Sequence, residues 1–147
     1  MFQGVVGINL DVKGRLAIPT KHRDQLTSGQ KDKLVLTSHP HRCLLLYPAE
    51  AWNPIRAQIM TFSSFDPQLS LWKRLLVGFA EDMELDNAGR VLISASQRQF
   101  AGLEKRVMLV GQGSHFELWS ESSWEKQISQ FDDGPINPPP GMENFAL

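Results

Sequence analysis

The sequence is poor in the features that mark secreted and membrane proteins. It has a single cysteine, Cys43, which excludes an internal disulfide and is typical of a reducing compartment. No segment approaches the ~18 uninterrupted apolar residues of a transmembrane helix. The first residues also lack the basic start and long apolar stretch of a signal peptide. We therefore expect a cytoplasmic protein that does not contact a membrane.

The short motifs of common enzyme families are also missing. There is no H-E-x-x-H helix, no G-x-S-x-G turn and no glycine-rich phosphate loop. His39, His41 and Cys43 lie close together, but their spacing matches no zinc pattern well and no fourth ligand is evident. The simpler interpretation is two loop histidines beside a buried strand cysteine. We predict no catalytic residue, no metal, no cofactor and no small-molecule substrate.

The chain has no excess of positive charge. Its 147 residues include 15 Lys and Arg against 16 Asp and Glu, which gives a formal net charge of −1. A nucleic-acid partner would therefore need locally clustered positive charge. The length fits one domain or one pair of intertwined half-domains, and the apolar share of 41% is enough for a modest core.

One segment of the sequence occurs twice. Residues 10–19 (LDVKGRLAIP) are matched by residues 85–94 (LDNAGRVLIS), with an acid, two variable residues, a glycine, an arginine and an apolar run. The similarity continues through two later apolar segments and a tryptophan, over about forty residues in each copy. The chain is therefore interpreted as two copies of one supersecondary unit.

The repeated motif predicts a tight turn between two strands. Gly14 and Gly89 can adopt a positive φ without a Cβ clash. Asp11 and Asp86 can accept hydrogen bonds from the backbone of the turn. These four residues are assigned a structural role in the turns.

Arg15 and Arg90 follow the two turns, where a long cationic side chain can reach outward. In one interpretation each arginine only pairs with the acid of its own turn, and an exposed pair of this kind contributes little stability. In the other, the arginines contact DNA. Arginine can donate two parallel hydrogen bonds to guanine O6 and N7, and a two-stranded ribbon is narrow enough to enter the major groove.

Alternation and turn residues predict the remaining elements. Strands are expected at 4–10, 15–18, 33–38, 43–47, 83–85, 90–93, 106–110 and 115–119. A short helix capped by Thr20 should end near Gly29, and its counterpart, capped by Ser94 or Ser96, should end at Gly102. Two apolar helices, starting at Pro48 and near Leu69, should pack on the core or on a second subunit. A last helix should follow residues 120–123.

Each copy resembles the AbrB-like (SpoVT-AbrB) DNA-binding unit, and the tandem arrangement resembles the MraZ family of bacterial transcriptional regulators. The matching blocks span almost the whole chain: residues 1–4, 14–19, 44–48, 101–103, 110–112 and 116–119. The D-x-x-x-R residues of the family correspond to Asp11 and Arg15, and to Asp86 and Arg90. The second copy departs from the family pattern, because Ser94 stands where proline is usual.

The resemblance implies an α+β, mainly β fold in which two βαβ-hairpin repeats form an intrachain pseudo-dimeric, swapped-hairpin β-barrel with packed helices. The repeats would span residues 1–52 and 81–131, with a helical linker at 53–80 and a flexible tail at 132–147. It further implies a ring-forming homo-oligomer, associated with the nucleoid. This oligomer would bind tandem G-rich promoter repeats of double-stranded DNA and typically repress the cell-division and cell-wall gene cluster that contains its own gene.

Other cations surround the first motif. Lys13 and Lys21 are expected to contact phosphates, which position a protein without specifying sequence. Arg23 and Arg98 could contact DNA or act as structural braces. Since the second copy has neutral residues at most equivalent places, we expect the first copy to supply most of the electrostatic binding.

The low net charge suggests that assembly is part of DNA binding, because several subunits on spaced repeats gain avidity. A rival interpretation is an antitoxin-type module that binds a partner protein as well as DNA, with the tail as a docking peptide. Antitoxin units of this type are normally single-copy and carry a longer partner-binding extension. Here a second repeat occupies the length of that extension.

Overall fold

The structure is a computed structural model that describes residues 1–27 and 33–146. The first half of the chain contains β1 (Val5–Asn9), β2 (Arg15–Ala17), α1 (Thr20–Thr27), β3 (Lys33–His39) and β4 (Cys43–Pro48). Next come α2 (Ala49–Ile59), α3 (Pro67–Lys73) and a π-helical turn, η1 (Arg74–Gly78). The second half contains β5 (Glu81–Glu84), β6 (Arg90–Leu92), α4 (Ala95–Ala101), β7 (Arg106–Gly111), β8 (Phe116–Ser120), α5 (Glu121–Ser129) and η2 (Gln130–Asp132).

Hydrogen bonds join six strands into one antiparallel sheet in the order β1-β7-β8-β4-β3-β5. β1 pairs with β7 from the second half, and β5 pairs with β3 from the first half, so the two halves are interleaved. The α+β, sheet-rich class is confirmed. The closed barrel is not: within residues 1–27 and 33–146, β1 and β5 are the edges of an open sheet, and β2 and β6 form a separate ribbon.

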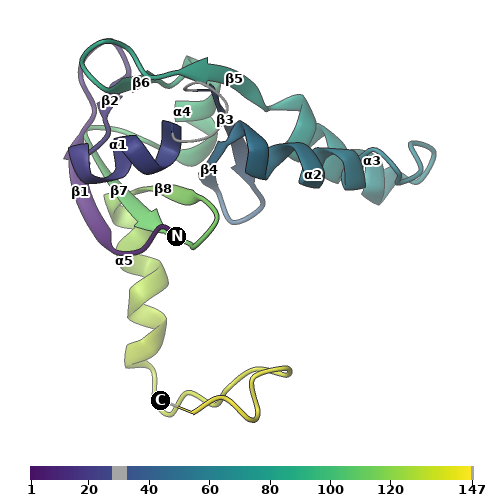
Figure 1. Cartoon of the computed structure of the whole chain (residues 1–147). Helices are drawn as coiled ribbons and strands as arrows, with labels where there is room; N and C mark the ends of the chain where they lie inside the picture. Colours follow the sequence, from purple (N-terminus) through teal and green to yellow (C-terminus); the bar gives the residue numbers. More distant parts are fainter. Residues whose placement is uncertain (28–32, 147) are drawn as a thin grey trace.

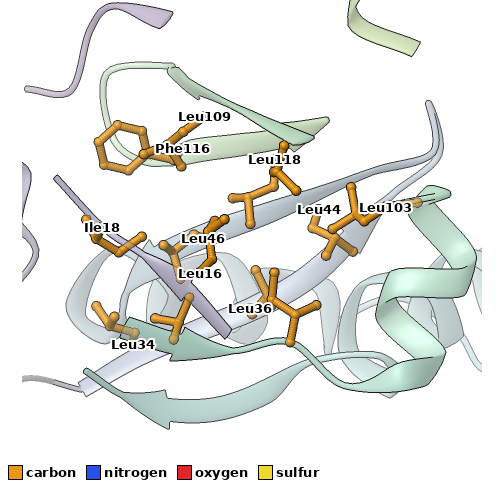
Figure 2. Packing of buried hydrophobic residues seen from close by; sticks show 14 of the residues in the cluster. Leu16, Ile18, Leu34, Leu36, Leu44, Leu46, Leu103, Leu109, Phe116 and Leu118 are labelled. Carbon is orange, nitrogen blue, oxygen red and sulfur yellow. The ribbon is translucent and has the colours of Figure 1, made fainter. Parts of the chain in front are cut away.

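Both faces of the sheet are covered. On one face, alternate side chains of the central strands form a buried cluster with the inward side chains of β2, β6 and the residues after them. In Figure 2, Leu16 and Ile18 lie among the leucines of the sheet. On the other face, a second cluster joins Cys43 and Trp119 to Trp52 and Ile59 of α2. Burial from both sides explains why β4 is apolar without alternation.

The β2–β6 ribbon is anchored to the sheet by its inward side chains. Leu16 and Val91 are paired in the antiparallel register and are both fully buried. Ile18 and Ile93, just beyond the strands, are also fully buried. The ribbon therefore has one face fixed to the core and one face directed outward, and Figure 1 places it away from the arm formed by α2 and α3.

The helix boundaries follow local capping. Ser94 caps α4 by accepting from the N–H of Gln97, and Gly102 ends the helix with a φ of 62°. Ser120 caps α5 in the same way. α2 starts at Ala49, one residue after the predicted start at Pro48. The predicted end of the first short helix near Gly29 lies outside the described residues.

The linker helices pack on the core at one end and are exposed at the other. The hydroxyls of Thr37 and Ser38 each donate to a carbonyl of η1 at 2.6 Å. Phe65, between α2 and α3, is 98% exposed, and Trp72 is half exposed. Trp52 and Ile59 of α2 are buried in the second cluster, and Leu76 and Val77 of η1 pack against it. Core packing is therefore confirmed for part of this helical segment, and contact of its outer part with a second subunit stays a prediction.

Candidate nucleic-acid interface

The first turn is held together by Asp11. One carboxylate oxygen, Oδ1, accepts from the N–H groups of Lys13 at 2.9 Å and Arg15 at 2.8 Å. The other, Oδ2, accepts from Arg15 Nε at 2.8 Å. The backbone hydrogen bond from Arg15, with the other donors, holds the pKa of Asp11 below its usual value although desolvation opposes this. Gly14 has a φ of +84°, as predicted.

The second turn repeats this geometry. Asp86 Oδ1 accepts from the N–H groups of Ala88 and Arg90, both at 2.9 Å, and Oδ2 accepts from Arg90 Nε at 2.8 Å. The backbone hydrogen bond from Arg90 is the largest of the influences that lower the pKa of Asp86. Gly89 has a φ of +73°. The same local sequence thus produces the same turn twice.

Each motif arginine is only partly engaged by its ion pair. The side chains of Arg15 and Arg90 are 31% and 33% exposed. In the part of the chain that the structure describes, the hydrogen bonds of both guanidinium groups use Nε alone. Guanidinium carries five N–H donors, so both terminal amino groups keep their donors for a planar acceptor pair. The ion-pair interpretation and the DNA-contact interpretation are therefore compatible.

The ribbon places both arginines on one outward face. In its register Arg15 lies opposite Leu92, and Ala17 lies opposite Arg90, while the residues between them point to the core. Leu92 is 59% exposed, and Val12 at the tip of the first turn is fully exposed. The outward position of Leu92 could not be predicted from the sequence, because this residue lies within an apolar run.

Three of the remaining predicted cations, Lys13, Arg23 and Arg98, lie at the two turns, whereas Lys21 lies beside the N-terminal residues. Lys13 is exposed within the first turn. Lys21 is exposed on α1, where it lines a shallow depression with Gln3 and Gln25. Arg23 and Arg98 are only partly exposed, since each donates to a main-chain carbonyl, Ile18 O and Ile93 O respectively.

The histidines and the cysteine show no arrangement that suggests chemistry. Cys43 is fully buried, and burial raises the pKa of its thiol to about 12. Across residues 1–27 and 33–146, no group of three or more His, Cys, Asp or Glu side chains is arranged to hold a metal ion.

Comparison with known proteins places these features in a family. The family model described as "MraZ protein, putative antitoxin-like" matches residues 1–75 and again residues 76–139. The chain belongs to the MraZ family. A protein of Methylobacillus flagellatus is 58% identical to it over the full length of both chains. One of Dechloromonas aromatica is 57% identical and one of Azoarcus sp. is 55% identical, also over both full lengths.

All three MraZ relatives are named transcriptional regulators. The family is one of regulators and not of enzymes, in agreement with the sequence-based prediction. Among the described residues, none of the helices has the length and apolar character that a membrane crossing would need.

Proposed function

We propose that this MraZ-family chain is a sequence-specific DNA-binding transcriptional regulator that reads guanine-rich sites through the β2–β6 ribbon. The observation that carries the proposal is the outward face of the ribbon, where Arg15 and Arg90 both keep their terminal amino groups free of partners among the described residues. Each arginine would donate two hydrogen bonds to guanine O6 and N7 in the major groove. Its ion pair would fix the direction of the guanidinium before binding.

The neighbouring side chains take supporting roles. Lys13 and Lys21 would contact phosphates and set the register of the ribbon on the duplex. Leu92, opposite Arg15, would provide an apolar contact of the kind that thymine methyl groups accept. Because the second turn carries Ala88 where the first has Lys13, the first repeat would supply most of the electrostatic attraction.

The finer features follow the family resemblance. The targets would be tandem G-rich repeats upstream of the cell-division and cell-wall gene cluster that includes the protein's own gene, with repression as the typical effect. Repeats at 1–52 and 81–131, a linker at 53–80 and a flexible tail at 132–147 would build each subunit of a ring. The ring would work in the cytoplasm at the nucleoid, and its repeated contacts would offset the low charge of one subunit.

The decisive test is Arg15→Ala in a binding titration against DNA from immediately upstream of the protein's own gene. Loss of one bidentate contact costs about 1–3 kcal/mol per site, so specific affinity should fall by about 5- to 150-fold while fold and assembly are unchanged. Arg106→Ala is the matched control, because Arg106 makes a similar Nε–carboxylate pair with Glu121 at 3.1 Å on another part of the surface. Equal affinities for Arg15→Ala and the unaltered protein would remove Arg15 from the interface.

A partner-protein function is the second candidate. It is favoured by the antitoxin-like description of the family and by exposed apolar side chains in the tail, such as Ile136 and Phe145. Under this proposal the tail would dock on a partner protein. Deletion of residues 132–147 would then abolish partner binding and leave DNA affinity intact, whereas a DNA-only regulator would show no partner to lose.

A further inference from the structure

Arg23 and Arg98 each lie against the turn of the opposite repeat. A Cβ atom built on Gly89 would overlap the guanidinium of Arg23, and one built on Gly14 would overlap the guanidinium of Arg98. Glycine is therefore favoured in each turn for two reasons. The backbone has a positive φ, and the arginine of the other repeat occupies the space that a side chain would fill.

A main-chain hydrogen bond between the two repeats accompanies each of these arginine–glycine contacts. The N–H of Ile93 donates to Gly14 O at 2.8 Å, and Arg98 Nη1 donates to Ile93 O. The N–H of Ile18 donates to Gly89 O at 2.9 Å, and Arg23 Nε donates to Ile18 O at 2.7 Å. The main-chain hydrogen bonds are the same in both arrangements, whereas Arg98 donates through Nη1 and Arg23 through Nε.

A path of hydrogen bonds leads from Arg98 to Arg15, the arginine that reads DNA from the first turn under the proposed function. Arg98 Nη1 donates to Ile93 O, and the N–H of Ile93 donates to Gly14 O. The N–H of Gly14 donates to Asp11 O at 3.0 Å, and the carboxylate of Asp11 accepts from Arg15 Nε. Arg98 belongs to the second repeat, whereas Gly14, Asp11 and Arg15 at the far end of this path belong to the first repeat.

We propose that Arg98 positions the turn that carries Arg15, and that Arg23 positions the turn that carries Arg90. Arg23 and Arg98 are positioning residues, and each reading arginine is set by the repeat that does not contain it. The structural part of this inference stands on the contacts alone, whereas its effect on DNA recognition rests on the proposed function. Proximity in sequence suggests the opposite pairing, since Arg23 follows Arg15 within the same repeat.

Hydrogen exchange measured by mass spectrometry on the full-length protein tests the crossed pairing without DNA. Since β2 and β6 are hydrogen-bonded to each other, Arg98→Ala should accelerate exchange of segment 10–17 more than that of segment 85–92, and Arg23→Ala should do the reverse. Loss of one hydrogen bond of ordinary net strength corresponds to roughly two- to tenfold faster exchange. Arg106→Ala, which removes a surface arginine outside both arrangements, should change neither segment.

Two results would overturn the inference. One is the parallel pattern, in which Arg23→Ala loosens segment 10–17 more than segment 85–92; the other is a pattern in which neither variant affects either turn. If an alanine variant unfolds and all segments exchange alike, Arg98→Lys and Arg23→Lys provide the same comparison. Lysine keeps the charge but lacks the guanidinium group that occupies the space beside each glycine, so the crossed pattern is expected with a smaller acceleration.

Binding titrations at several salt concentrations test the effect on recognition. Arg98→Ala should weaken binding to the promoter repeats several-fold with no change in the dependence of log K on log salt concentration. If Arg98 contacted a phosphate, its removal would instead reduce the magnitude of that slope by about 0.9. Crossed exchange together with a lowered slope would overturn the positioning role in recognition. Absence of specific binding by the unaltered protein would refute the proposed function and leave the exchange result intact.

Discussion

Replacing Gly14 by alanine should destabilise the protein more than the same change at another glycine with a similar backbone. Gly14 has a φ of +84°, and a methyl group there would meet the guanidinium of Arg98. Gly102, at the end of α4, has a φ of +62°, but a methyl group there would have no neighbour within 4 Å. The pair therefore separates the cost of the backbone conformation from the cost of displacing Arg98.

The expected magnitudes follow from these two environments. A positive φ in an alanine costs about 1 kcal/mol after allowing for the smaller entropy of the unfolded chain. Gly102→Ala should therefore lower the free energy of unfolding by about 1 kcal/mol. Gly14→Ala bears the same cost and also breaks the hydrogen bond from Arg98 to Ile93 O, which is worth about 0.5–1.5 kcal/mol. The displaced side chain adds strain, so a total of about 2–3 kcal/mol is expected.

Urea unfolding at one fixed protein concentration measures these costs, since any assembly makes apparent stability depend on concentration. The Arg98→Ala background provides the internal check. With the guanidinium removed, the methyl group still lies 3.0 Å from Ile93 O, so Gly14→Ala should cost about 1 kcal/mol for the backbone conformation plus a smaller cost for this close contact. The two changes should therefore be non-additive by about 1 kcal/mol. The reasoning fails if Gly14→Ala costs no more than Gly102→Ala, or if its cost is the same with and without Arg98.

Two further predictions concern titratable groups. Burial is the main cause that lowers the pKa of His22, His39 and His115 below the ordinary value of 6.5, so the unfolded chain binds protons that the folded chain does not. The free energy of unfolding should therefore fall as the pH drops below about 6.5, by up to ~1.4 kcal/mol per pH unit and histidine; urea midpoints that are unchanged between pH 7.5 and 5.5 would contradict this. The pKa of the Cys43 thiol is raised to about 12, so a thiol reagent at pH 8 should label it only after urea unfolding, and fast labelling of the native protein would show that the strand opens.

Much of the local structure follows from the sequence because its causes are local. The D-x-x-G-R pattern predicts the turns, since the acceptors of Asp11 and the positive φ of Gly14 involve only the next few residues. Ser94 and Gly102 bound α4 for the same reason. Ser94 stands where the family usually has proline. β6 nevertheless ends at Leu92, and the Ser94 side chain caps the helix that follows.

The arrangement of the strands does not follow from the local pattern. Val5 pairs with Val110, and Lys33 pairs with Glu84, in registers that depend on how distant segments pack. Alternation tells which face of a strand is buried but not which strand lies beside it. The sequence alone does not decide the roles of Arg23 and Arg98 for the same reason, since the groups that they contact belong partly to the other repeat.

The two repeats agree where the geometry demands it and differ where only charge is affected. Both turns have the acid, the glycine, the arginine, the isoleucine and the positioning arginine, and these residues together fix the direction of the guanidinium. The flanking positions differ: Lys13 corresponds to Ala88 and Lys21 to Ser96, all on the surface. A phosphate contact needs charge but little precision, while a base contact needs a fixed direction. Under the proposed function, one scaffold therefore carries two arginines in the same geometry and places most of the electrostatic attraction beside the first.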